Sequence, residues 1–251
     1  MAPIRRGDGT PLEIPGVSEV RAGDGRVFFD AIPDSVTNHW PMDEGSGSTL
    51  TDAVGDDDIS LNHSDWDSSV GRGGAVTVWD GIDNEGEASI NFTDTLSFWI
   101  WFNVSDGSSE AHMVDIGDGS DASLQFDIGV PDDNELRLFA NDADGGDNAI
   151  VQTSVSEDTW YFGGVQVDVS EGEIVLHLAT ADDSDLTEVG SNNFDGLDPS
   201  NPDTLALGYW DREDIRHFDG KLDDFGLAND DIITESDLMD VFDSTKSTYA
   251  D

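Results

Sequence analysis

The sequence contains no cysteine and very few basic residues. The absence of cysteine excludes disulfide bonds, thiolate metal sites and a cysteine nucleophile. Ten Lys and Arg residues, of which two are Lys, stand against 56 Asp and Glu, so the formal net charge is −46 over 251 residues. Nucleic acids and anionic membranes repel such a chain, and we expect neither as a partner.

Long apolar runs are also missing. No stretch approaches the roughly 18 apolar residues that a membrane helix needs. The N-terminal segment MAPIRRGDGT lacks the apolar region of a secretory signal. These absences predict a protein that is made and folded in the cytoplasm.

Aspartate is present in large excess. Of the 56 acidic residues 43 are Asp, and the longest acidic run, Asp56 to Asp58, has three residues. A hydrophobic content of 36%, with seven Trp and twelve Phe, indicates a folded chain and not an acidic tail. At 1 M ionic strength the Debye length falls to about 3 Å, which screens most surface carboxylates from one another. The composition therefore predicts a halophilic protein with an acidic surface.

The first 26 residues differ from the rest because their charges cancel. Four acidic residues are balanced there by Arg5, Arg6, Arg21 and Arg26, and Pro and Gly are frequent. Carboxylates are costly to bury, so a segment without excess acid suits a contact surface. We predict an N-terminal assembly arm over residues 1–35 that docks on another subunit or on its own fold. A flexible leader is the alternative.

Short apolar stretches separated by Gly, Asn and Asp follow from about residue 36 and predict an antiparallel β-sandwich or barrel. The predicted strands are Val36–Trp40, Ala75–Trp79, Leu96–Val104, Met113–Ile116, Ser123–Ile128, Glu135–Ala140, Trp160–Val169, Glu173–Ala179, Thr204–Trp210 and Lys221–Leu227. The strand around Phe98 to Phe102 is apolar on both faces, which indicates a covered outer face. A single helix is predicted after a capping box at Thr234 and Asp237.

Five blocks occur in the order of a known family. They are HWPMDEGSGSTLTDAVG (39–55), AVTVWDGIDN (75–84), TLSFWIWF (95–102), TWYFGGVQVD (159–168) and HFDGKLDDFGLANDDIITESDLMDVF (217–242). In this order they resemble the laminin-G-like, concanavalin-A-like jelly-roll family. The resemblance implies an all-β fold, an antiparallel jelly-roll β-sandwich over residues 36–251 with an extended N-terminal arm and one short C-terminal helix.

The same resemblance implies a structural calcium ion that ties the first strand to the last. The matching carboxylates are Asp43, Glu44, Asp223 and Asp224, and Ca²⁺ takes six to eight oxygen ligands. In so acidic a chain, these four residues are alternatively ordinary surface carboxylates.

A carbohydrate site is the second feature that the family implies. Jelly-roll lectins stack a sugar on an exposed aromatic ring, and the candidates are Tyr209, Trp210, Asp211 and Arg212, with Trp66 as another. A place in the core is the alternative for each ring. Catalysis is not expected, because the chain has no Glu-x-Asp-x-Glu string of β-glucan hydrolases and its five His are scattered.

A second resemblance covers the arm. The segment IRRGDGTPLEIPGVSEVRAGDGRVFFDAIPDS (4–35) is similar to the start of structural proteins of haloarchaeal tailed viruses. It implies a non-enzymatic structural protein at the virion surface, in a decoration, turret, spike or tail fibre. Its partners would be other virion subunits, copies of itself and a cell-surface glycan used for host attachment. The alternative is a host lectin or adhesion module on the cell surface of a halophilic archaeon.

Overall fold

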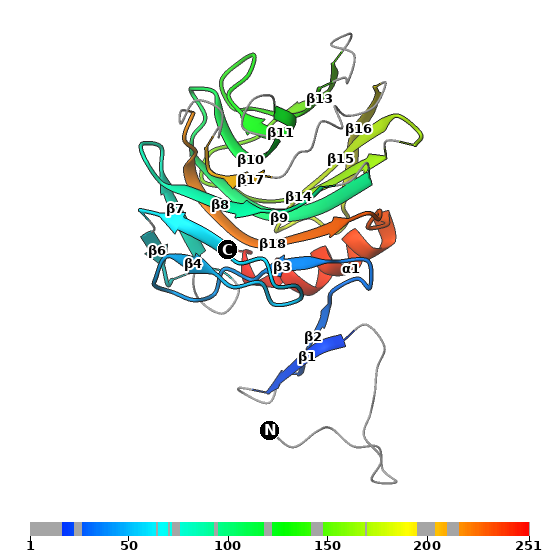
Figure 1. The fold of residues 1–251 in the computed structure, drawn as a ribbon. Coiled ribbons are helices and arrows are strands. Elements are labelled where there is room, and N and C mark those ends of the chain that lie inside the picture. Colours follow the sequence, from blue (N-terminus) through cyan, green and yellow to red (C-terminus); the bar gives the residue numbers. More distant parts are fainter. Residues whose placement is uncertain are drawn as a thin grey trace.

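The structure is a computed structural model that describes most of the chain. The described residues are 17–22, 27–63, 65–69, 71, 76–92, 95–117, 122–141, 148–168, 170–194, 204–209 and 216–250, and for 17–31, 76, 122 and 123 the description covers the backbone alone. Figure 1 shows two curved β-sheets packed face to face, with a helix beneath them.

We call the first sheet the front sheet. Its strand order is β13-β12-β11-β10-β17-β8-β5-β4. The bounds are β4 Thr49–Leu50, β5 Ile59–Asn62, β8 Glu85–Ser89, β10 Ala111–Gly117, β11 Ala122–Ile128, β12 Glu135–Ala140, β13 Ala149–Ser154 and β17 Thr204–Leu207. All of its pairings are antiparallel.

The second sheet is the back sheet. Its strand order is β16-β15-β14-β9-β18-β7-β6, and β3 also pairs with β18. The bounds are β3 Asn38–Trp40, β6 Asp65–Asp67, β7 Val76–Asp80, β9 Thr95–Asp106, β14 Trp160–Asp168, β15 Glu173–Thr180, β16 Thr187–Asn193 and β18 Asp219–Asn229. The order of strands in the two sheets makes an antiparallel jelly-roll sandwich, as the sequence predicts.

Strand β9 is covered on both faces. Phe98, Ile100 and Phe102 point into the core between the sheets, whereas Trp99 and Trp101 lie in a second apolar cluster outside the back sheet. All five side chains are fully buried. The alternation therefore predicts this strand correctly, and the cover on its outer face is the C-terminal helix.

Helix α1 spans Glu235–Thr245 and begins where the sequence predicts it. The Thr234 hydroxyl accepts a hydrogen bond from the Asp237 amide at 3.2 Å, which caps the helix. Its apolar face packs on the back sheet, where the Trp101 indole donates to the Thr245 hydroxyl at 2.9 Å and stacks on Tyr249 at 4.1 Å. A short 3-10 helix, η2 Lys246–Thr248, follows.

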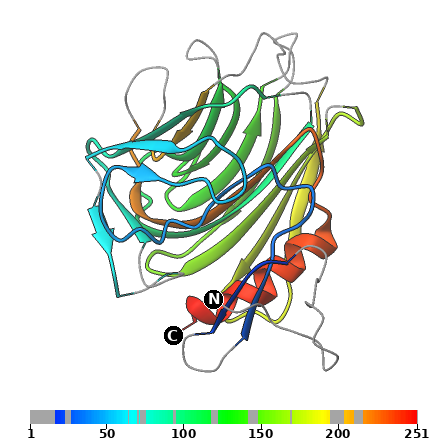
Figure 2. The same cartoon turned by 60° about the horizontal axis from the view of Figure 1, so that its bottom comes forward.

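The N-terminal arm contains a two-stranded antiparallel hairpin made of β1 (Val17–Ala22) and β2 (Val27–Ala31). Strand β2 lies against α1, and Figures 1 and 2 place the hairpin on the helix side of the sandwich. Arg5, Arg6 and Arg26 fall outside the described residues, as does the side chain of Arg21. The assembly role of the arm stays a prediction.

Among the described residues, no helix has both the length and the apolar character needed to cross a membrane.

Candidate functional site

The outer face of the front sheet carries polar residues, since the apolar residues of its strands point into the core. Cross-strand register aligns the outward side chains in two rows. The longer row is Ile150, Phe139, Gln125, Asp115, Ala206, Glu87, Ser60 and Thr49. The shorter row is Gln152, Arg137, Asp127 and His112. Asp115 and Asp127 are buried on this face, at 2% and 0% exposure, and buried carboxylates need charged or hydrogen-bonding partners.

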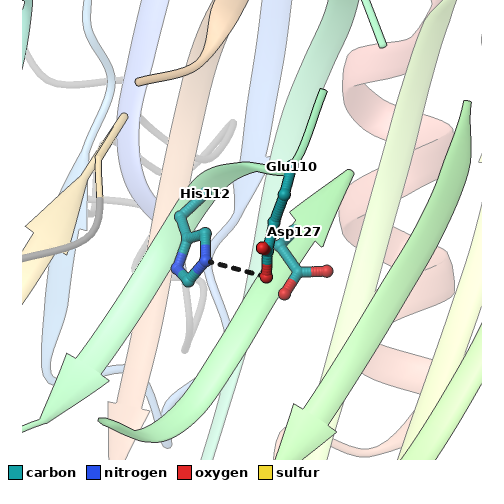
Figure 3. Close-up of side chains that lie close together, drawn as sticks. All are labelled: Glu110, His112 and Asp127. Carbon is teal, nitrogen blue, oxygen red and sulfur yellow. Dashed lines mark ion pairs between the residues drawn. The ribbon is translucent and has the colours of Figure 1, made fainter. Parts of the chain in front are cut away.

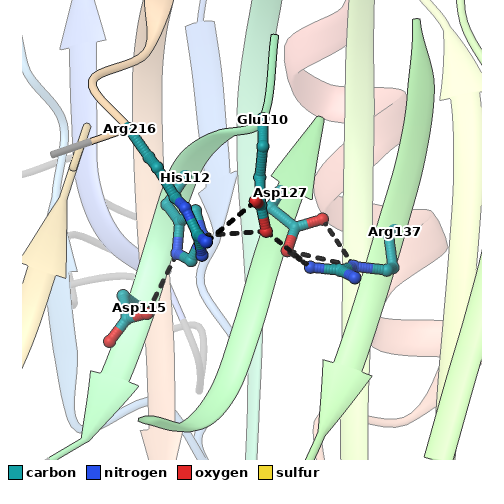
Figure 4. A network of polar contacts seen from close by, with 6 residues as sticks. All are labelled: Glu110, His112, Asp115, Asp127, Arg137 and Arg216. Carbon is teal, nitrogen blue, oxygen red and sulfur yellow. Dashed lines mark hydrogen bonds and ion pairs between the residues drawn. The ribbon is translucent and has the colours of Figure 1, made fainter. Parts of the chain in front are cut away.

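Arg137 is paired with two carboxylates. Its Nε donates to Asp127 Oδ1 and Oδ2 at 3.0 and 3.1 Å, its Nη2 donates to Asp127 Oδ2, and Nη2 also lies 3.3 Å from Glu110 Oε1. Figure 4 shows this fork, with Arg137 on β12 reaching across to Asp127 on β11. Burial raises the pKa of Asp127, and Arg137 opposes that shift.

Arg216 reaches Glu110 from the opposite side. Its Nη2 lies 3.1 Å from Glu110 Oε2, and its carbonyl accepts a hydrogen bond from the His112 amide at 3.0 Å. The backbone of Arg216 has a φ of 61°, which is rare for residues other than glycine. Such strain persists where the surroundings impose it and is common at ligand sites.

His112 is fully buried between two carboxylates. Its Nδ1 lies 3.0 Å from Asp115 Oδ2, and its Nε2 lies 3.9 Å from Glu110 Oε1 (Figure 3 draws the second contact). Burial by itself lowers the pKa of His112, but the bonds to Asp115 and Glu110 outweigh it, and the pKa is raised. In turn, His112 lowers the pKa of Glu110, with help from Arg216 and Arg137.

Glu110, His112 and Asp127 also have the spacing of a metal site. Their ligand atoms all lie within 4.8 Å of one another. The donor set does not fit a cation, however, because Arg137 occupies both oxygens of Asp127 and two guanidinium groups already contact Glu110. The cluster is therefore a network in which Arg137, Arg216 and His112 contact the carboxylates Glu110, Asp115 and Asp127.

The network opens to solvent next to an aromatic ring. The Arg137 guanidinium carbon lies 5.2 Å above the centre of the Phe139 ring, and Phe139 is half-buried. The side chains of Glu110 and Arg216 are 27% and 30% exposed, and Arg137 is 12% exposed. Ile150 is paired with Phe139 and is 38% exposed. Phe139 and Ile150 therefore form an apolar surface next to hydrogen-bonding groups whose positions are fixed by ion pairs.

The segment predicted to bind sugar begins at this face. Tyr209 is 5% exposed, its hydroxyl lies 3.5 Å from Glu87 Oε2, and its ring stacks on His217. Trp210, Asp211 and Arg212 fall outside the described residues. Trp66 is half-buried, packs against the core and donates to the Gly47 carbonyl at 3.2 Å. A sugar-binding role for these residues stays a prediction.

The predicted calcium ligands lie on two paired segments but do not form one ligand group. Asp43 and Glu44 follow β3, which pairs with the part of β18 that follows Asp224. Asp223 accepts a hydrogen bond from the Tyr249 hydroxyl at 2.7 Å, and Asp224 lies 2.7 Å from His39 Nε2. Among the residues that the structure describes, only Glu110, His112 and Asp127 lie close enough together to be grouped as possible metal ligands. The calcium ion stays a prediction.

The sequence shows no motif for this network, because its members come from separate segments: Glu110 precedes β10, Asp127 is on β11, Arg137 is on β12 and Arg216 precedes β18. The sequence contains one indication of the network. Arg137 is one of only ten basic residues, and it stands between Leu136 and Leu138, which are buried, so its own side chain points to the outer face.

No family model matches the chain, and no curated protein matches it either. Solved structures do. The binding domain of botulinum neurotoxin serotype D has a TM-score of 0.64 and 13% identity over 84% of this chain. A structure of the botulinum neurotoxin DC binding domain in complex with SialylT has a TM-score of 0.61 and 11% identity over 84% of this chain. The chain spans about half, 52%, of each neurotoxin domain.

A third similar structure is matched over nearly its whole length. Domain 4 of a GH43 extracellular arabinanase from Geobacillus stearothermophilus, solved with arabinotriose, has a TM-score of 0.61 and 15% identity, over 82% of this chain and 97% of that one. The fold is a jelly roll. At these identities the likeness shows the fold alone.

Proposed function

We propose that the protein is a non-enzymatic glycan-binding module whose ligand lies on the outer face of the front sheet. The observation that carries this proposal is the half-buried Phe139 ring beside Arg137, with Glu110 next to it. Sugars present flat C–H faces and many hydroxyl groups. An aromatic ring that adjoins rigid charged hydrogen-bonding groups complements both features.

The similar structures support this proposal at the level of the fold. The arabinanase domain was solved with arabinotriose, and one neurotoxin binding domain was solved with SialylT. Another structure of that neurotoxin domain holds rat synaptotagmin II, a protein. A protein ligand is therefore the competing occupant of this face.

A glycan array probed in molar salt tests the proposal. We expect the wild-type protein to bind a defined set of glycans and Phe139→Ala to lose at least 10-fold in affinity for them. Ile82→Ala is the control, because Ile82 is 70% exposed at the turn between β7 and β8. Tryptophan fluorescence of the buried indoles checks that each variant is folded. Absence of glycan binding by folded wild-type protein would contradict the proposal.

We further propose that the module works on a halophilic surface, either a virus particle or an archaeal cell, and that the N-terminal arm attaches it. What supports this is the charge balance of the first 26 residues and the position of the hairpin against α1. Recovery of the intact chain from purified particles would favour the virion, and recovery from the cell envelope would favour the cell. Deletion of residues 1–30 should leave a folded sandwich that no longer joins its assembly.

A further inference from the structure

The proposed site on the outer face of the front sheet contains cationic side chains, and the carboxylates with which they pair indicate which glycans the site accepts. We infer that the site selects uncharged glycans and rejects acidic ones, an inference that rests on the proposed glycan-binding function.

The first argument is that the positive charge at the site is already neutralised. Arg137 contacts Asp127 and Glu110, and Arg216 contacts Glu110. The part of the Arg137 guanidinium that these carboxylates leave for a glycan carboxylate is Nη1, next to the Nη2 that contacts Glu110. A glycan carboxylate there would lie close to Glu110, whose side chain is 27% exposed, and like charges at contact distance repel.

The second argument concerns the groups that remain for a ligand. Arg137 uses Nε and Nη2 for its carboxylates, and among the described residues none accepts a hydrogen bond from Nη1. Gln152 lies directly opposite Arg137 on β13 and is exposed. Glu135 is half-buried two residues before Arg137, and its Oε2 accepts from the Ser154 hydroxyl at 3.1 Å. The two N–H groups of Nη1, an amide and a carboxylate suit hydroxyl groups, which both donate and accept.

The third argument is the field of the whole chain. With a formal charge of −46, the protein repels any anion that approaches it. Salt screens this long-range repulsion, but it does not remove the contact between a bound carboxylate and Glu110 or Glu135.

The experiment compares matched neutral and sialylated or uronic forms of the same glycans on an array, with affinities then measured by calorimetry in molar salt. We expect the neutral member of each bound pair to bind at least 10-fold more tightly. Glu110→Gln should reduce this ratio several-fold, because it frees guanidinium charge for an acidic sugar. Asp240→Asn is the control, since it removes one exposed carboxylate from α1 on the opposite side of the molecule.

The outcomes separate the inference from the proposed function. If wild-type protein binds acidic members as tightly as neutral ones, the inference is wrong and the glycan-binding function stands. Failure of folded protein to bind any glycan removes both. Should Glu110→Gln not fold, Glu135→Gln tests the repulsion alone, because it removes a carboxylate two residues from Arg137 that pairs with no guanidinium among the described residues, and an unchanged ratio in that variant would overturn the inference.

Discussion

Asp52 organises the loop between β4 and β5 through a single carboxylate. Its Oδ1 accepts from the amides of His39, Val54 and Gly55 at 2.9 to 3.0 Å, and its Oδ2 accepts from Asn38 Nδ2 at 2.7 Å. The side chain is 8% exposed. Nothing in the sequence distinguishes this residue from the other 42 Asp, because the donors that define its role come from a fold that brings β3 beside the loop.

We expect Asp52→Ala to lower the free energy of unfolding by about 3 kcal/mol, since it leaves several backbone N–H groups without an acceptor. Urea denaturation in molar salt measures this change. Asp56→Ala is the matched control, because Asp56 is exposed in the same loop, and it should change the stability by less than about 0.5 kcal/mol. Equal effects of the two variants would contradict the role assigned to Asp52.

The buried His112 gives the protein a pH-dependent stability. The pKa of His112 in the folded protein is raised above its ordinary value of 6.5. The stabilisation that this produces is complete below that value and is lost as the pH rises through the folded pKa. We therefore expect the urea midpoint to fall as the pH rises above about 6.5 in the wild type and to fall less in His112→Gln.

The control for this prediction is His63→Gln, because His63 is 60% exposed. That variant should keep the wild-type pH profile. If His112→Gln also keeps it, the histidine is not the group responsible.

At the scale of elements, three aspartates face one another across the back sheet. Asp219 on β18 is directly paired with Asp80 on β7 and with Asp106 on β9. Burial raises the pKa of Asp219, and the charges of Asp106 and Asp80 raise it further. Like charges directly opposite each other destabilise a sheet.

Asp219→Asn should therefore stabilise the protein by about 0.5 kcal/mol at low salt, and the gain should shrink in molar salt, where the Debye length is about 3 Å. Thermal denaturation at two salt concentrations measures both effects. Asp168→Asn is the matched control, because the Asp168 carboxylate accepts from the Ser170 hydroxyl at 2.7 Å and the Glu171 amide at 3.1 Å. Asp168→Asn should destabilise the protein. Stabilisation by both variants would argue against a specific effect of the repulsion of Asp219 by Asp80 and Asp106.

The strands that could be predicted from the sequence are those with buried faces. Strand β12 has the predicted bounds, and β9 and β14 differ from theirs by a few residues. The strands that were missed, β4, β5, β6, β8, β13 and β16, are short or polar, and several lie at or near sheet edges. Residues Thr187 to Asn193 of β16 have no buried side chain. A strand that gains most of its stability from pairing leaves little apolar pattern.

The candidate site was less predictable than the fold. The sequence predicted a sugar site at Tyr209, Trp210, Asp211 and Arg212, with Trp66 as another candidate. Of the first four the structure describes Tyr209, whose ring stacks on His217, the residue after Arg216. The Glu110 network depends on cross-strand register between β10, β11 and β12. Register is set by the hydrophobic pattern of the strands and by the geometry of the turns, and the side chains that it brings opposite one another form no motif along the chain.

At the scale of the whole molecule, the net charge predicts that folding depends on salt. With 56 acidic residues against ten basic ones, we expect self-repulsion to oppose the compact state until salt screens it. We expect the urea midpoint to rise steeply with KCl from 0.1 to 3 M, a range over which the Debye length falls from about 10 Å to below about 3 Å.

Sucrose is the control for general solute exclusion, which also favours compact states. At matched osmolality it should stabilise the protein far less than KCl does. A midpoint that is independent of KCl would show that the acidic surface does not govern stability.

The two sides of the sandwich carry different elements. Helix α1 and the hairpin of β1 and β2 lie together on the outside of the back sheet, and the Glu110 network lies on the outside of the front sheet. Copies that are held through the helix side would therefore all turn their front sheets in one direction. If the front sheet binds glycans as proposed, weak individual contacts with a repetitive glycan surface would combine as avidity, and a densely arrayed form would adhere firmly even where a single copy dissociates quickly.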